Sequence, residues 1–257
     1  MRYAAMPNAI CRPSCRVYQA AGRDCPLFMF DSLPSTNAFI RENAHQLPSF
    51  AAVLAKTQTA GRGRLGRSFY SPPGSGLYMS VLIRDLPASA CLRATPAAAT
   101  AVCLLLEEET GRDFQIKWVN DVYLDGRKVC GILCEKIPEG MICGIGINLA
   151  EPDDGFPGEI RDTAGAAGCR ADAAELACRL PDLLAKMLTH PETAFSEYEK
   201  RMFLAGRHVL YRGESALVLG LESDYSLRVR YADGTEEALR AGGVTLHEAL
   251  SGPQSGR

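Results

Sequence analysis

Residues 51–83 read AAVLAKTQTAGRGRLGRSFYSPPGSGLYMSVLI, an apolar run and a second apolar run on either side of a loop rich in glycine and arginine. Both runs, 51–56 and 77–83, are short, and the second is rich in aromatic and branched residues, as buried strands are. The prolines and glycines of 71–76 disfavour a helix between them. The segment therefore predicts a strand, a long open loop and a second strand.

The loop at 56–67 concentrates positive charge. Between residues 43 and 84 the sequence has five Lys or Arg residues and no Asp or Glu. Glycines allow the backbone to come close to a ligand, and arginine side chains match the oxygens of phosphate and carboxylate groups with two hydrogen bonds. We expect the loop to bind a compact anion, to be mobile when empty and to close over a phosphate or an adenylate.

Two common nucleotide-binding motifs do not explain this loop. Gly61, Gly63 and Gly66 have the spacing of the dinucleotide fingerprint, but that motif requires a helix directly after the glycines. Here the segment 71–76 and a predicted strand follow instead. A Walker A loop is absent because no Gly-Lys-Ser/Thr follows a four-residue spacer.

Charge and cysteine usage narrow the function classes. The 257 residues contain 28 Lys or Arg and 30 Asp or Glu, so a net charge of −2 gives no overall field for nucleic acid or an anionic membrane. The ten cysteines form no CxxC pair, which disfavours a metal site or a disulfide framework. The apolar run 97–106 is too short to cross a bilayer, and 1–30 lacks the apolar core of a signal peptide. We expect a cytoplasmic protein with no membrane or nucleic-acid partner.

The rest of the chain indicates an α+β fold. A helix is predicted at 95–111, and antiparallel strands at 114–118, 122–124, 128–135 and 141–149, with a hairpin turn at Asp125-Gly126. Helical spacing returns at 176–187, where Pro181 should start or kink a helix, and at 193–203. After Gly206, short strands separated by glycines indicate a small β-barrel. The predicted organisation is a variable extension at 1–27, a larger domain at 28–204 and a small β domain at 205–257.

A second candidate group lies at 117–121, followed by Lys128 and Gly131. Asn120-Asp121 falls between two predicted strands, where such a pair is also typical of an ordinary turn. Lys128 could equally be a solvated charge on a strand. Only together with the arginine loop does Lys128 become a candidate ligand residue.

Taken in order, five motifs of the chain resemble biotin protein ligase, also called biotin–[acetyl-CoA-carboxylase] ligase. They are Ser35-Thr36-Asn37, the loop 61–67, the segment 117–121, Lys128 with Gly131, and 144–148. Their order and spacing match that family over about residues 28–150, and 207–250 is similar to its SH3-like C-terminal domain. The chain differs at Val119, where the family often has proline.

The resemblance implies a mixed β-sheet catalytic domain flanked by helices, of the class II aminoacyl-tRNA synthetase and biotin ligase type, with a small SH3-like β-barrel. Only 27 residues precede the region of resemblance, too few for the N-terminal DNA-binding domain of the bifunctional members. We therefore expect the monofunctional type, as a monomer or a homodimer.

The activity implied is ATP-dependent formation of biotinyl-5′-AMP and transfer of the biotinyl group to a lysine of a biotin carboxyl carrier protein, with Mg²⁺ on ATP. The resemblance implies catalytic roles for Lys128, Arg62 and Asp121, and leaves open whether Asp121 is a base or a positioning residue. Biotin would contact Ser35, Thr36, Asn37, Gln58, Gly61, Arg62, Gly63, Arg64, Lys128 and Gly131. The adenylate would contact Arg62, Arg64, Arg67, Phe69, Asn120, Asp121, Lys128 and Asn148.

Two alternatives stay open at this point. A lipoate or octanoyl protein ligase-like enzyme shares the fold but should lack the doubled Gly-Arg loop. A non-enzymatic nucleic-acid-binding module could use a Gly-Arg loop and a small barrel. Against the module, 207–250 holds five Arg, no Lys and seven Asp or Glu.

Overall fold

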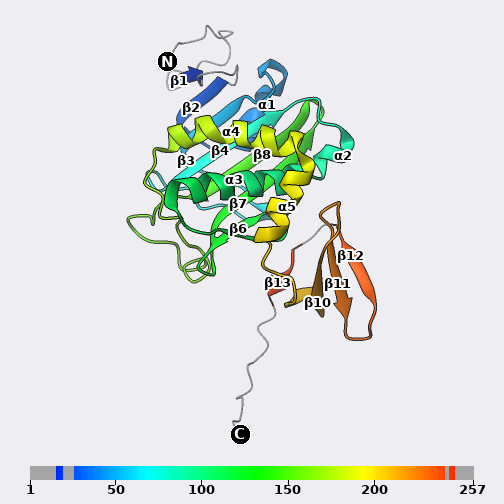
Figure 1. Cartoon of the computed structure of the whole chain (residues 1–257). Coiled ribbons are helices and arrows are strands. Elements are labelled where there is room, and N and C mark those ends of the chain that lie inside the picture. Colours follow the sequence, from blue (N-terminus) through cyan, green and yellow to red (C-terminus); the bar gives the residue numbers. More distant parts are fainter. Residues whose placement is uncertain (1–15, 20–25, 241–242, 247–257) are drawn as a thin grey trace.

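The computed structural model describes residues 16–19, 26–240 and 243–246 (Figure 1). Most of the predicted extension 1–27 lies outside these residues. The strands are β1 (Arg16–Gln19), β2 (Pro26–Leu33), β3 (Ala52–Gln58), β4 (Gly76–Ile83), β5 (Gln115–Lys117), β6 (Asp121–Leu124), β7 (Arg127–Ile137), β8 (Gly140–Asn148), β9 (His208–Tyr211), β10 (Glu214–Leu221), β11 (Leu227–Tyr231), β12 (Glu236–Leu239) and β13 (Thr245–Leu246). The helices are α1 (Thr36–Asn43), α2 (Ala88–Cys91), α3 (Ala94–Thr110), α4 (Ala173–Thr189) and α5 (Pro191–Arg201), with short 3₁₀ turns at Ala44–Gln46 and Arg64–Gly66.

The first eight strands form one mixed sheet in the order β1-β2-β3-β4-β8-β7-β6-β5. The β2–β3 pair is parallel, and the other pairs are antiparallel, including all those in the segment 114–149. The β6–β7 hairpin turns at Asp125 and Gly126, which have φ angles of 50° and 75°. Two positive φ values are what a two-residue hairpin turn requires, and an Asp-Gly pair adopts them readily. The predicted mixed α+β architecture is confirmed.

Helices cover the two faces of the sheet unequally. α3, α4 and α5 pack on one face around a large apolar core, as the front of Figure 1 shows. α1 covers part of the other face, over a smaller core that includes Phe28, Phe39 and Ile142. The predicted helix end at Gly111 is confirmed by its left-handed φ of 66°. Of the two alternatives for Pro181, a helix start is wrong, because Pro181 lies inside the single helix α4, and a kink stays a prediction.

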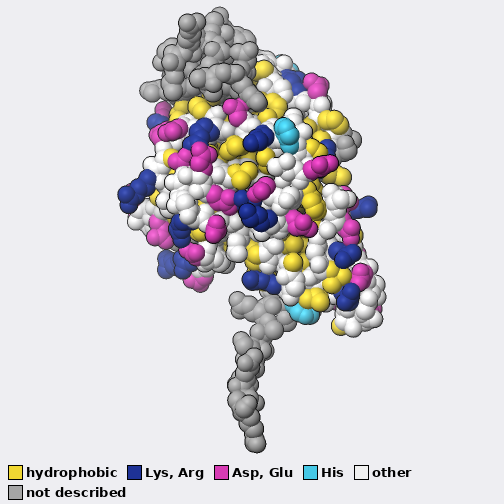
Figure 2. Space-filling model, in the orientation of Figure 1, with side chains coloured by type: hydrophobic (Ala, Val, Ile, Leu, Met, Phe, Trp, Pro, Cys, Tyr) yellow, Lys and Arg dark blue, Asp and Glu magenta, His cyan; other side chains and the backbone are white. Residues whose placement is uncertain are grey.

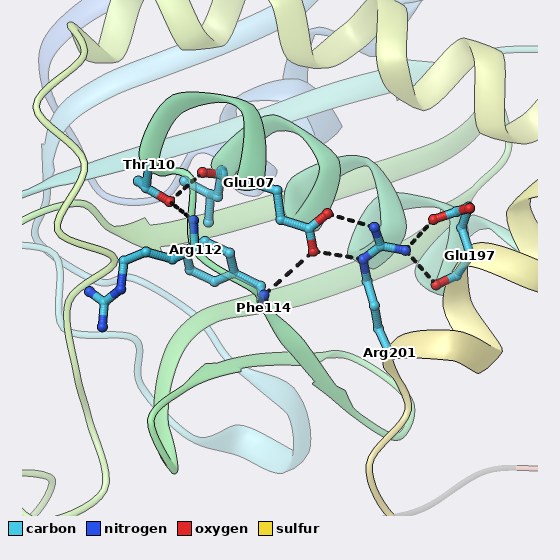
Figure 3. A network of polar contacts seen from close by, with 7 residues as sticks. Glu107, Thr110, Arg112, Phe114, Glu197 and Arg201 are labelled. Carbon is cyan, nitrogen blue, oxygen red and sulfur yellow. Dashed lines mark hydrogen bonds and ion pairs between the residues drawn. The ribbon is translucent and has the colours of Figure 1, made fainter.

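Arg201 at the end of α5 links this helix to α3 through hydrogen-bonded ion pairs (Figure 3). Its Nε and Nη2 donate to the Glu107 carboxylate of α3 at 2.8 and 2.5 Å, and its Nη1 pairs with Glu197 one turn earlier. The Arg201 side chain is only 8% exposed. Its hydrogen bonds to Glu107 and Glu197 raise its pKa, and the bond to Glu197 lowers the pKa of that carboxyl. A buried guanidinium with two carboxylate partners ties α3 to α5.

A second sheet follows α5, with the strand order β12-β11-β10-β9-β13. Among the described residues this sheet is open, since β12 and β13 are its two edges and do not pair with each other. The predicted small β unit is present, while its closure into an SH3-like barrel stays a prediction. Within the described ranges, no helix combines the length and the hydropathy needed to cross a membrane.

Candidate active site

A cavity of about 270 Å³ lies where the N-terminus of α1, the loop after β3 and strands β5 to β8 meet. Its lining brings together thirteen of the fifteen predicted site residues: Ser35, Thr36, Asn37, Gln58, Arg62, Gly63, Arg64, Arg67, Phe69, Asn120, Asp121, Lys128 and Gly131. These residues come from four separate segments of the sequence, and the sheet is what places them around one space.

Uncharged polar groups gather beside the first residues of α1. The Thr36 N–H donates to Gln58 Oε1 at 2.9 Å, and Gln58 Nε2 donates to Ser71 Oγ at 3.0 Å. Ser35 caps α1, since its Oγ accepts from the Ala38 N–H at 3.5 Å. Hydroxyl, amide and helix N-terminal groups therefore gather at this end, where they can hydrogen-bond an uncharged polar ligand group.

Glycines form the floor of the cavity. Gly144 and Gly146 lie on the α1-facing side of β8, and Gly131 pairs with Gly146 across the β7–β8 ladder. A Cβ on Gly146 would come within 2.5 Å of the Phe69 ring, and one on Gly144 would overlap Asn37 Oδ1. The absence of these side chains gives room for Phe69 and Asn37 and leaves a flat surface for a ligand.

The opposite end is cationic and internally linked. Arg64 Nη1 donates to Asn120 Oδ1 at 2.5 Å, and Asn120 Nδ2 donates to Asp121 Oδ1 at 2.8 Å. The same Asp121 oxygen lies 2.6 Å from Lys128 Nζ. Four side chains from the loop, the segment after β5 and strands β6 and β7 thus form one chain of polar contacts. It fixes two cations beside the floor.

A β-bulge brings Lys128 to the cavity. Tyr123 pairs with Lys128 but Val122 pairs with Cys130, so Val129 is an extra residue on β7. Val129 and Cys130 are both buried, at 1% and 0% exposure, and face the helical side in succession. The alternation is therefore reversed at this point, and Lys128 shares the α1-facing side with Gly131, three residues later. A Cβ on Gly131 would lie 3.3 Å from Lys128 Nζ.

Arg62 makes a contact with an acid that sequence reasoning did not include. Its Nη1 lies 3.5 Å from Glu135 Oε1, and the same oxygen lies 2.9 Å from Arg41 Nη2. The other carboxylate oxygen of Glu135 accepts from Asn37 Nδ2 at 2.8 Å. The Arg62 side chain is half-exposed. An anionic ligand that binds Arg62 would therefore compete with the Glu135 carboxylate for it.

Lys117 is a further lysine in the cavity lining. Burial lowers its pKa, and the nearby charges of Lys128 and Arg67 act in the same direction, while Asp121 opposes them. Lys128 and Arg67 thus disfavour the charged form of Lys117. An anion bound among them would relieve this repulsion.

Two predicted site residues do not line the cavity. Gly61 is buried behind the loop, where a Cβ would overlap the Phe69 carbonyl oxygen, so its part is to let the loop fold. Asn148 donates to the Gly165 carbonyl at 3.0 Å and ties the end of β8 to the segment that follows.

Sequence reasoning also missed several lining residues, namely Lys117, Trp118 and the segment 243–245. Lys117 and Trp118 belong to a recognised motif and could have been chosen from it. The sequence of 243–245 has no pattern that indicates a binding site. This segment reaches the cavity because of the way the second sheet packs against the first domain.

The cavity has a shape and a set of polar and cationic groups that could receive an elongated ligand with a polar head and an anionic end. Residues 27–150 match the model of the Biotin/lipoate A/B protein ligase family. The bifunctional ligase/repressor BirA of Bacillus subtilis is 39% identical over 145 residues, which cover 54% of this chain and 45% of that protein. The chain therefore spans less than half the length of this relative.

Two further proteins are similar over most of their own length. The biotin–[acetyl-CoA-carboxylase] ligase of Mycobacterium tuberculosis is 27% identical over 232 residues, which cover 83% of this chain and 85% of that protein. The solved structure of a biotin protein ligase from Aquifex aeolicus in complex with biotin and ATP superimposes with a TM-score of 0.72 at 28% identity, covering 87% of this chain and 99% of that one.

Proposed function

We propose that this protein is an ATP-dependent biotin protein ligase. It would activate biotin as biotinyl-5′-AMP and transfer the biotinyl group to a lysine of a biotin carboxyl carrier protein. The observation that carries the proposal is one cavity that joins the hydrogen-bonding groups of Thr36 and Gln58 to Arg62, Arg64 and Lys128 across a glycine floor. The similarity to a biotin protein ligase solved with biotin and ATP supports it.

Biotin would lie along the floor with its neutral ureido head at the α1 end. Thr36, Gln58 and Ser35 present donors and acceptors there, and the missing side chains of Gly144 and Gly146 leave room for Asn37 and Phe69 at the floor of the cavity. Buried polar groups that stay unpaired with a wrong ligand are a strong source of specificity. The carboxylate would then point to the cationic end.

The first step joins two anions, the carboxylate of biotin and the α-phosphate of ATP. A carboxylate oxygen attacks phosphorus, the bond to the β-phosphate oxygen breaks, and pyrophosphate leaves. Charge neutralisation and in-line placement matter most in such a step. Lys128 would stabilise the charge that develops on the α-phosphate, and Asp121 holds Lys128 in place through the 2.6 Å contact. Arg62 and Arg64 would face the carboxylate and phosphate oxygens.

In the second step the acceptor lysine loses a proton to solvent, its neutral amine attacks the acyl carbon, and the bond from that carbon to the AMP phosphate oxygen breaks. AMP leaves, and the second amine proton passes to solvent or to the departing phosphate. Asp121 is the carboxylate in the cavity lining, and its Oδ1 already accepts from Asn120 and contacts Lys128. We assign it a positioning role for Lys128 and for the incoming ammonium. Phe69, whose ring lies over Gly131 and Gly146, would offer a stacking surface on the adenylate side.

Magnesium is part of the proposal only as an ion that arrives with ATP. Within the described ranges, no three His, Cys, Asp or Glu side chains gather in a way that could hold a metal ion. Asp121 is engaged by Lys128. In the part of the chain that the structure describes, Mg²⁺ would therefore be held mainly by ATP oxygens and water, and no proposed step depends on a protein-built metal site.

The location and the carrier partner are also proposals. The seven described cysteines are free thiols, and four of them are buried, in keeping with a reducing cytoplasm. A carrier protein is the acceptor that the chemistry requires. The division at about residue 204 and an SH3-like C-terminal domain belong to the same proposal.

Release of pyrophosphate from ATP tests the function, measured with biotin, with lipoate and with neither. We expect release that depends on biotin and falls about 10²–10³-fold in Lys128→Ala. Lys136→Ala, which removes an exposed lysine of the same strand β7, is the matched control and should behave as the parent chain. Release with lipoate but not biotin would move the assignment to the lipoate branch.

A binding test separates the enzyme from the nucleic-acid alternative. Acidic and basic side chains are intermingled on the helix-covered face (Figure 2), which does not favour nucleic acid there. We expect no tight RNA retention on filters at low or moderate salt. No pyrophosphate release together with salt-sensitive RNA retention would refute the ligase proposal.

A further inference from the structure

The second sheet reaches the cavity at two places. The segment Gly243, Val244 and Thr245 lines the cavity directly, and Thr245 belongs to β13, which pairs with β9. Elsewhere in the same sheet, Tyr225 contacts Trp118, and Trp118 also lines the cavity. The position of the lining segment therefore depends on how the sheet is held against the first domain.

Tyr225 is presented by a tight turn between β10 and β11. The Tyr225 N–H donates to the Glu222 carbonyl at 2.9 Å, and Asp224 Oδ1 accepts from the Ser226 N–H at 2.9 Å. Tyr225 itself adopts a φ of 65°. A turn closed by these bonds fixes the direction of the ring relative to the sheet.

The ring and the backbone of Tyr225 both make contact with the first domain. The ring meets Tyr198 of α5 edge-on at 5.3 Å and 88°, and Phe195 at 5.2 Å and 66°. The Tyr225 carbonyl accepts from Trp118 Nε1 at 2.8 Å, and the Tyr198 hydroxyl donates to the Val119 carbonyl at 3.2 Å. Trp118 and Val119 are thus held by α5 and by the second sheet together.

The hydroxyl of Tyr225 adds nothing to this contact. Tyr225 is 4% exposed, and its hydroxyl has no hydrogen-bond partner among the described residues. A buried hydroxyl without a partner is unfavourable, so what holds the sheet here is the ring and the carbonyl.

The contact lies at the cationic end of the cavity. Trp118 directly follows β5, which is one edge of the eight-stranded sheet, while Gln58 ends β3 toward the other edge. Lys117 and Asp121 are close to Trp118 in sequence. Both line the cavity, and Asp121 contacts Lys128 at its cationic end. The Tyr225–Trp118 contact therefore lies beside the proposed nucleotide end of the cavity and away from Gln58.

From this we infer that Tyr225 is a positioning residue that docks the second sheet on Trp118 and so holds 243–245 against the nucleotide end of the cavity. The inference rests on the proposed function for the identity of the two ligands. The docking contact itself does not depend on that identity.

Substitution of Tyr225, with KM measured separately for ATP and biotin, tests the inference. Tyr225→Ala should raise KM for ATP about tenfold, the ratio that corresponds to the loss of two ordinary aromatic contacts, and leave KM for biotin within about twofold. Tyr225→Phe should restore the parent values because only the unpaired hydroxyl is removed. Leu239→Ala, which shortens a buried side chain on the far edge strand β12, is the matched control for loss of stability of the sheet.

Fluorescence gives a readout that needs no turnover. Trp118 is the only tryptophan of the chain, and it is 3% exposed. Tyr225→Ala should shift its emission to longer wavelength and increase quenching by acrylamide, whereas Tyr225→Phe and Leu239→Ala should not.

An equal rise in KM for both substrates, or an equal effect of Leu239→Ala on KM for ATP, would overturn the inference. Unchanged Trp118 emission in Tyr225→Ala would overturn the docking contact itself. If the parent chain releases no pyrophosphate with biotin, the proposed function fails, and the emission of the variants still decides the docking contact.

Discussion

Gly144→Ala should remove about 3 kcal/mol of folding stability through one side chain, Asn37. The added Cβ would overlap Asn37 Oδ1 and lie 2.9 Å from its Cγ and Nδ2, so Asn37 must leave its place. That side chain donates to Glu135 at 2.8 Å and to the Leu133 carbonyl at 3.2 Å, and lies 2.5 Å from Ser80 Oγ. Three buried hydrogen bonds at about 1 kcal/mol each give the stated total.

A double-mutant cycle tests this reasoning by urea unfolding. In an Asn37→Ala background the obstructing side chain is gone, so Gly144→Ala should cost no more than about 0.5 kcal/mol there. Gly158→Ala is the matched control, because a Cβ at Gly158 has nothing within 4 Å. Equal costs of Gly144→Ala in the two backgrounds would refute the proposed steric cause.

Three further outcomes follow from the contacts described above. Arg201→Leu should cost about 3 kcal/mol in urea unfolding, because Glu107 loses its partner, and a cost below about 1 kcal/mol would contradict this. Arg201 lowers the pKa of Glu197, so the native state binds fewer protons at this group than the unfolded state. The stabilisation by this pair is therefore fully present above the pKa that Glu197 has in the unfolded chain. It is lost as the pH falls through the lower pKa that Glu197 has in the folded protein. The stability difference between parent and Arg201→Leu should accordingly narrow below about pH 4, and a constant difference across that range would count against the pair. Gln58→Leu leaves the buried Thr36 N–H without its acceptor and should raise KM for biotin about tenfold with little change in KM for ATP, whereas similar shifts for both substrates would place the polar head elsewhere.

Local features of the fold were predictable because a few neighbouring residues encode them. The helix 95–111 ends at a glycine with positive φ, and Asp125-Gly126 makes its hairpin through two positive φ values. Ser35 caps α1 through its own side chain, which is another feature set by a few neighbouring residues. Pro181 was less predictable, because a proline can begin a helix or lie within one, and here it lies within α4.

Strand order is decided over long distances in the sequence. β8 lies between β4 and β7, and β2 pairs in parallel with β3 across α1. No short pattern fixes these neighbours, because they depend on which faces can be buried together.

By itself, the sequence determined which chemical groups the site contains. The sequence shows these groups directly: the glycine- and arginine-rich loop, the segment 117–121, Lys128 and the two glycines of β8. Their order along the chain resembles that of the biotin protein ligase family. The tertiary structure alone decided how they face one another. The bulge at Val129 turns Lys128 toward Gly131, the pairing of β7 with β8 sets Gly131 opposite Gly146, and the second sheet adds 243–245. The physical reason is range: residue type and local backbone preference act over a few residues, whereas register and docking are set by burial between segments far apart in the chain.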